Sequence, residues 1–92
     1  MALYLITYDL RKPGRKYDDL YTLLETSWKA KRLAESVWLA ELKGPAEAIR
    51  DLMLAQLDAN DRVAVIEIVS GADWAVQQGM TGGVALLRKY SP

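Results

Sequence analysis

The fold of this chain is decided by the stretch Leu3-Tyr4-Leu5-Ile6-Thr7-Tyr8, which Asp9 closes. Its aliphatic, aromatic and β-branched side chains are typical of a β-strand. Pro13-Gly14 follows shortly afterwards and is a turn signal. The pattern therefore predicts a first strand over residues 3–8 that leads into a loop rich in basic residues.

Two segments with helical periodicity follow. Between Lys16 and Ser27, apolar side chains recur at i, i+3, i+4 and i+7, which predicts an amphipathic helix. Pro45 fits the first position of a second helix, which continues to Leu57 and ends at the turn Asp58-Ala59-Asn60-Asp61. The chain thus alternates between strand-like and helical segments.

The remaining strand-like segments are less regular. Residues 33–42 form a second strand, or a bulged hairpin with legs 32–35 and 37–42. From Arg62 to Val69, Glu67 alone interrupts a run of apolar residues, which predicts a strand buried on both faces in the sheet interior. Residues 74–78 have a weaker strand pattern, and residues 82–90 fit either a short helix or an exchanged edge strand.

This order of elements is closest to the plan β-α-β-β-α-β. It predicts one α+β domain over residues 1–92, of ferredoxin-like type, with an antiparallel sheet and two helices on one face. A domain of 92 residues buries a modest share of its unfolded surface, so pairing with a second copy would add buried area. Residues 71–92 are expected to form an atypical C-terminal segment of this domain.

The composition restricts the chemistry that the chain can perform. It contains no cysteine and no histidine, which excludes disulfides, thiolate metal sites and a histidine general base. Catalysis would rest on carboxylates, hydroxyls, lysine or arginine, with a metal that prefers oxygen ligands. The first apolar run is too short for a signal sequence, and no run is long enough to span a membrane. We expect a cytoplasmic protein with no membrane partner.

The charges are distributed unevenly, although the formal net charge is zero. Basic residues form two groups, and neither group contains an acid: Arg11, Lys12, Arg15 and Lys16, and then Lys29, Lys31 and Arg32. Acidic residues dominate from Glu35 to Glu67. One end of the fold is therefore expected to be positive, which favours a nucleic-acid partner.

Three pieces of the sequence carry a resemblance in their order and spacing. They are Tyr4-Leu5-Ile6-Thr7-Tyr8-Asp9-Leu10, Arg32-Leu33-Ala34-Glu35-Ser36-Val37-Trp38 and Leu57-Asp58-Ala59-Asn60-Asp61-Arg62-Val63. Over roughly residues 2–70 the chain resembles the small CRISPR-associated endonuclease family, the second of the universal adaptation proteins. Pro13-Gly14 with Tyr17 and Leu20 is similar to the stand-alone SinR-like relatives of that family.

The resemblance implies a ferredoxin-like homodimer that binds RNA or DNA, with nuclease activity in some members. The Asp9 residues at the ends of the two first strands would approach across the two-fold axis and share one Mg²⁺ ion, or Mn²⁺. Residues 71–92 differ from the family's usual C-terminal strand, which docks onto the partner subunit or an integrase. This difference favours the SinR-like and VapD-like branches, some linked to ribonuclease toxins, and makes the C-terminal segment a candidate site for a protein partner.

Asp9 is the candidate catalytic and metal-binding residue, since a two-fold axis supplies a second carboxylate and Mg²⁺ prefers oxygen ligands. Its alternative role is to accept hydrogen bonds in the following turn. The candidate nucleic-acid-binding residues are Arg11, Lys12, Arg15, Lys16 and Arg32. Their alternative is a solvated surface or, for Arg32, a salt bridge to Glu35.

Tyr8, Ser36 and Trp38 are candidates for dimer contact or base stacking, and the core is the alternative place for Tyr8 and Trp38. Trp28, in a loop flanked by lysines, is the better stacking candidate. The expected function is that of a metal-dependent endonuclease. The alternative is a non-catalytic dimer that binds nucleic acid or protein through the same basic rim.

Overall fold

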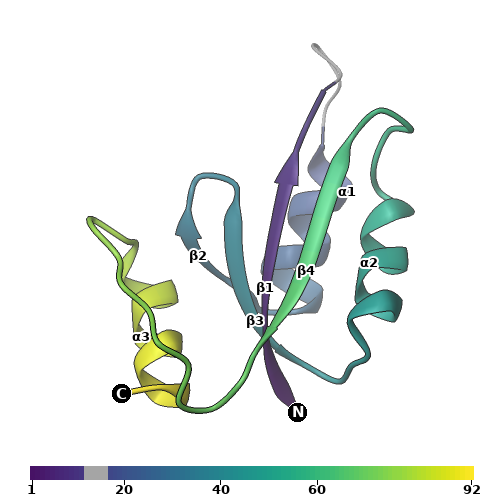
Figure 1. The fold of residues 1–92 in the computed structure, drawn as a ribbon. Helices are drawn as coiled ribbons and strands as arrows, with labels where there is room; N and C mark the ends of the chain where they lie inside the picture. The colour runs from purple at the N-terminus through teal and green to yellow at the C-terminus, as the bar shows by residue number, and fades with distance from the viewer. Residues whose placement is uncertain (12–16) are drawn as a thin grey trace.

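The computed structural model describes residues 1–11 and 17–92. The elements in these ranges are β1 (Ala2–Asp9), α1 (Asp18–Thr22), the π-helical turn η1 (Leu23–Ser27), β2 (Lys31–Ala34), β3 (Val37–Leu42), α2 (Ala46–Leu54), β4 (Arg62–Ile68) and α3 (Thr81–Tyr90). Figure 1 shows α2 and α3 on opposite sides of the sheet. None of the helices in these ranges is long and apolar enough to cross a membrane.

The strands of the described residues form one antiparallel sheet in the order β2-β3-β1-β4. In the centre, Leu5 of β1 lies opposite Leu39 of β3 and Ile66 of β4. The hairpin interpretation of residues 32–42 is confirmed, with a register shift between Arg32 and Ala34. This α+β arrangement, with its strand order, is compatible with the predicted ferredoxin-like plan.

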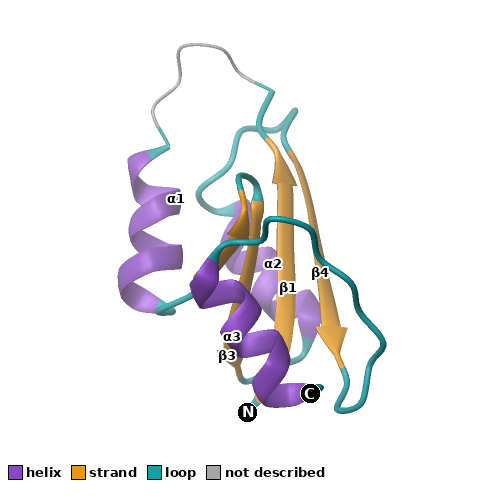
Figure 2. Cartoon of the chain, turned by 90° about the vertical axis from the view of Figure 1, so that its left-hand side faces the viewer, coloured by secondary structure: helices purple, strands orange, loops and turns teal. Residues whose placement is uncertain are grey.

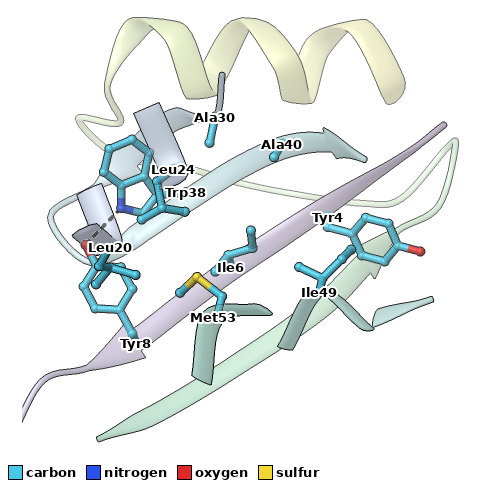
Figure 3. Close-up of a cluster of buried hydrophobic side chains, with 10 residues drawn as sticks. All are labelled: Tyr4, Ile6, Tyr8, Leu20, Leu24, Ala30, Trp38, Ala40, Ile49 and Met53. Carbon is cyan, nitrogen blue, oxygen red and sulfur yellow. Dashed lines mark hydrogen bonds between the residues drawn. The ribbon is translucent and has the colours of Figure 1, made fainter. Parts of the chain in front are cut away.

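The larger core lies between the sheet and one layer of helices. Alternate side chains of β1 and β3 meet Leu20 and Leu24 of the first helical segment, and Ile49 and Met53 of α2 (Figure 3). The buried residues of this cluster are Tyr4, Ile6, Tyr8, Leu20, Leu24, Ala30, Trp38, Ala40, Ile49 and Met53. The predicted pair of helices on one face is therefore present, although the end of the first one widens into a π-helix.

A third helix covers part of the opposite face of the sheet (Figure 2). Residues 81–90 form α3, so the helical alternative for this segment is confirmed, whereas the strand predicted at residues 74–78 is wrong. These residues instead belong to a connection held by hydrogen bonds. Trp74 Nε1 donates to the Ser91 carbonyl at 2.7 Å, and the Met80 amide donates to the Leu33 carbonyl of β2 at 2.9 Å.

The prediction that β4 lies in the sheet interior is wrong, because β4 is an edge strand. Val63 and Val65 pack toward the α2 side, but Ile66 is 54% exposed and Val69 is 60% exposed. On the other face, α3 packs mainly over β2 and β3, so that Leu3 of β1 is buried there while Ile66 of β4 stays exposed. An apolar edge strand of this kind favours pairing with another chain.

Candidate functional site

Asp9 occupies the last position of β1, at the end of the sheet where the β2–β3 turn also lies. Side chains alternate along a strand, so its carboxylate belongs to the face opposite to Tyr8, the face that α3 partly covers. The Asp9 side chain is 56% exposed. Across the strand pair, Arg62 of β4 lies directly opposite Asp9.

Two guanidinium groups flank the Asp9 carboxylate. Nη1 of Arg11 lies 3.3 Å from Asp9 Oδ2, and Nη1 of Arg62 lies 3.7 Å from the same oxygen. All three side chains are well exposed, so each ion pair contributes less than about 1 kcal/mol to stability. Each arginine has five N–H donors, and most of them are left for an anion such as a phosphate.

Arg62 was missing from the predicted site residues. Its place beside Asp9 depends on the pairing register of β1 with β4, which joins residues far apart in the sequence. The local sequence marks Arg62 as the start of a strand but gives no sign that Asp9, more than fifty residues earlier, lies opposite it. The contact of Arg11 with Asp9, by contrast, follows from their closeness along the chain.

A cleft of about 380 Å³ opens beside Asp9 at the β2–β3 turn. Its lining consists of Tyr8, Asp9, Leu10, Tyr21, Arg32, Glu35 and Ser36. The predicted candidates Asp9, Arg32 and Ser36 thus meet at one cleft. Polar groups of both charge signs line it, which is a property of binding sites more than of packed cores.

Arg32 is held in this cleft by aromatic rings. Its guanidinium carbon lies 4.3 Å from the centre of the Trp38 ring and 5.6 Å from that of Tyr21, which are cation–π distances. Its Nε atom is buried and has no hydrogen-bond partner among the described residues. The alternative salt bridge between Arg32 and Glu35 is not formed. The aromatic rings therefore fix the direction of a cation whose charge is not neutralised by a bonded carboxylate.

Burial raises the pKa of Tyr21, and the neighbouring Tyr8 hydroxyl raises it further, whereas the Arg32 guanidinium acts in the opposite direction. The net result is a pKa above the ordinary value for tyrosine. Tyr21 therefore stays neutral at neutral pH and adds no negative charge to the cleft beside Arg32.

Tyr8 and Trp38 are core residues, in agreement with the alternative interpretation of each. Trp38 Nε1 donates to Tyr8 Oη at 3.0 Å, and the two side chains are 3% and 6% exposed (Figure 3). Neither offers enough surface for a base or a partner chain to stack on in this structure. Trp38 acts on the site indirectly, through its contact with Arg32.

Tyr8→Phe is expected to destabilise the fold by about 1 to 2 kcal/mol, because the buried Trp38 N–H loses its acceptor. Urea unfolding measures this loss. In a double-mutant cycle with Trp38→Phe, the double variant should lose less than the sum of the two single losses. Additive losses would show that the hydrogen bond contributes nothing.

Asp61 accepts hydrogen bonds from Arg11 and Tyr17, the described residues on either side of residues 12–16. Its carboxylate accepts from the Arg11 amide at 2.6 Å, from Tyr17 Oη at 2.9 Å and from the Asp58 amide at 2.8 Å. Arg11 and Tyr17 are thereby tied to the turn that precedes β4. The other predicted basic residues, Lys12, Arg15 and Lys16, lie outside the described residues.

Asp61→Ala is expected to destabilise the protein by about 1 to 2 kcal/mol, because it leaves partly buried donors without their acceptor. Asp61→Asn keeps one acceptor oxygen and should lose less. Thermal unfolding of the two variants checks this order. Equal losses would mean that the hydrogen bonds to the retained oxygen contribute little.

The donor chemistry of the site suits a hard divalent ion. Asp9 offers an exposed carboxylate, which fits a Mg²⁺ ion that keeps most of its waters. Among the described residues, no group of three or more acidic side chains is placed to hold a metal. A tightly held ion would therefore need ligands beyond this one carboxylate, from a second chain or from the substrate.

Comparisons with known proteins bear on the fold. No protein-family model matches the chain, and a search of curated proteins finds no match. Among solved structures, the chain is similar to the "Crystal structure of a hypothetical protein TT1823 from Thermus thermophilus", with a TM-score of 0.65 and 23% identity. The similarity covers 86% of this chain and 94% of that chain. At this identity the likeness supports the fold alone.

Proposed function

We propose that this chain forms a symmetric homodimer that hydrolyses phosphodiester bonds in RNA or DNA, with a Mg²⁺ or Mn²⁺ ion shared by Asp9 of both chains. The observation that carries the proposal is the exposed Asp9 carboxylate with Arg11 and Arg62 beside it. A metal-binding oxygen next to phosphate-binding cations is what this reaction needs. The resemblance of the three sequence pieces to a nuclease family points to the same chemistry.

The residues around Asp9 have separate roles in this proposal. A bound divalent ion lowers the pKa of a coordinated water and stabilises the departing oxygen. Arg11 and Arg62 lie close enough to Asp9 to hold a phosphate next to it, and their charges offset those of the substrate. Arg32, directed by Trp38, binds a further phosphate of the same strand in the neighbouring cleft.

The proposed pairing uses the exposed part of the sheet face on the α3 side, at the ends of β1 and β4. Asp9 shares this face with Leu5 and with the exposed Ile66. A second copy seated there would bury apolar surface and bring the two Asp9 side chains to one interface. Sedimentation of the purified protein tests this step, and a monomer at all concentrations would contradict it.

The activity is tested with labelled single-stranded RNA and double-stranded DNA, each incubated with Mg²⁺ and then with excess chelator. Cleavage that requires the metal supports the proposal and identifies the substrate. Intact substrates in every reaction would overturn the nuclease proposal.

A second candidate function is a dimer that binds nucleic acid without cutting it. The ion pairs of Asp9 with two arginines favour it, because this cluster is already positive without a metal. Binding should then survive the chelator and weaken steeply with salt, since phosphate contacts release counterions. Binding that disappears with the metal would exclude this alternative.

A further inference from the structure

A second pocket is lined by residues near the start of β1 and the end of β3, at the opposite end of the sheet from Asp9. It measures about 350 Å³, within the size range of small-molecule sites. Its lining consists of Met1, Ser27, Trp28, Lys29, Lys31, Glu41, Leu42 and Leu86. It shares no lining residue with the Asp9 cleft.

The backbone beside this pocket departs from regular geometry in two places. The π-helical turn η1 ends at Ser27, and Lys29 adopts a φ of 52°, in the left-handed region. π-Helical turns recur at functional sites. A left-handed backbone conformation at a residue other than glycine lowers the stability of the fold by roughly 1 to 2 kcal/mol. Hydrogen bonds from the Trp28 and Ala30 amides, at 2.9 and 2.8 Å, hold the loop in this form. The strained turn places a lysine next to a half-buried tryptophan at the pocket.

The pocket carries cations whose charge is not neutralised nearby. Lys29 and Lys31 are exposed, and neither forms an ion pair with a residue in the described ranges. Glu41, the acidic residue of the lining, already accepts from Tyr90 Oη at 2.8 Å and from Lys89 Nζ at 3.1 Å. The Tyr90 hydroxyl and the Lys89 ammonium hold the pKa of Glu41 below its ordinary value. An anion can approach the two lysines without meeting an unpaired carboxylate.

We propose that this pocket is a second nucleic-acid contact, at which Trp28 stacks on an unpaired base while Lys29 and Lys31 bind the flanking phosphates. Sites that bind single-stranded nucleic acid commonly combine an aromatic face, on which a base stacks, with cations that bind the backbone. The inference rests on the nucleic-acid binding of the proposed function and narrows its substrate to chains with a single-stranded segment.

The register of the sheet indicates that one strand of nucleic acid can reach both the Trp28 pocket and Asp9. Lys31 is paired with Leu39, Leu39 is paired with Leu5, and Asp9 lies four residues beyond Leu5. At about 3.3 Å per residue and about 4.8 Å between strands, the Cα atoms of Lys31 and Asp9 are roughly 16 Å apart. A single strand of a few nucleotides spans this distance.

The test measures binding of uridine and thymidine oligonucleotides in excess chelator, so that cleavage plays no part in it. Stacking should quench the fluorescence of Trp28, whereas Trp38 is buried and Trp74 lies outside the pocket lining. Trp28→Phe should bind nearly as tightly as the unmodified protein but without most of the quenching. Trp28→Leu, which fills the site without an aromatic face, should bind about tenfold or more weakly.

The lysines are tested by replacing Lys29 and Lys31 with glutamine together. The slope of the logarithm of affinity against that of salt should fall by about 1.4, since each phosphate contact contributes about 0.7 for single strands. Lys43→Gln, an exposed lysine outside the lining, is the matched control and should leave the slope unchanged. Circular dichroism checks that each variant folds.

Two results would overturn the inference in distinguishable ways. If the protein binds oligonucleotides but the Trp28→Leu and double-lysine variants bind equally well, the pocket is not a contact, while the proposed function stands. If the protein binds no oligonucleotide even at low salt, the inference and the nucleic-acid role of the protein fail together.

Discussion

Asp9→Asn is expected to abolish metal-dependent cleavage while leaving the fold in place and without weakening nucleic-acid binding. The amide keeps the size of the side chain but loses the charge that holds a divalent ion. Metal stabilisation of the transition state is worth several kcal/mol, so the cleavage rate should fall about a thousandfold or more. Stability should change little, because the side chain is more than half exposed. Single-turnover cleavage with saturating Mg²⁺ measures the loss.

The same substitution should strengthen binding measured in chelator. Arg11 and Arg62 lose their shared anion in Asp9→Asn, so both are left to contact phosphate. Asp51→Asn is the matched control, because Asp51 on α2 is equally exposed and also pairs with an arginine, Arg50, at 2.9 Å. Asp51→Asn should cleave and bind normally. Cleavage by Asp9→Asn at the normal rate would remove Asp9 from the chemistry.

Two neighbouring glycines of α3 should respond in opposite directions to the same substitution. A Cβ atom at Gly83 would lie 2.7 Å from Leu33 Cα and 2.8 Å from the Arg32 carbonyl oxygen. These are backbone atoms of β2, so α3 has to move away. Gly83→Ala is therefore expected to destabilise the protein by about 2 to 3 kcal/mol. Urea unfolding followed by circular dichroism measures it.

Gly82→Ala provides the control within the same helical turn. Its Cβ would lie 3.4 Å from the Lys31 side chain, an ordinary contact with a flexible group. Alanine is the better helix former by about 1 kcal/mol, so this variant should be slightly more stable than the unmodified protein. Equal effects at the two positions would contradict the close packing of α3 on β2.

Much of the fold could be predicted from local pattern. The first strand, the helical periodicity around Leu20 and Leu24, and the helix after Pro45 all appear in the structure, although α2 ends at Leu54, before the predicted end at Leu57. The error at β4 has a physical cause. An apolar run such as Val63–Val69 reports that its side chains avoid water, but it does not identify what covers them.

The candidate site was predictable only where its residues are close along the chain. Asp9 and Arg11 are two residues apart, and their contact follows from a strand end and its loop. Arg62 and Asp61 reach the same place through strand pairing and a turn about fifty residues away. Trp38 is a core residue, whereas its contact partner Arg32 reaches the cleft, and the sequence alone does not show this difference. Hydrophobic periodicity predicts single helices and strands, but it does not predict these contacts between residues far apart in the sequence.

The two faces of the sheet carry unequal cores, and this sets an order of opening within the native state. Ten buried residues join α1, η1 and α2 to the sheet, but only four, Leu3, Leu33, Leu39 and Leu87, form the buried centre on the α3 side. Segments with few buried contacts open at lower free energy than the whole molecule. Amide protons of α3 should therefore exchange with deuterium well before those of β1, making the C-terminal layer a separate foldon.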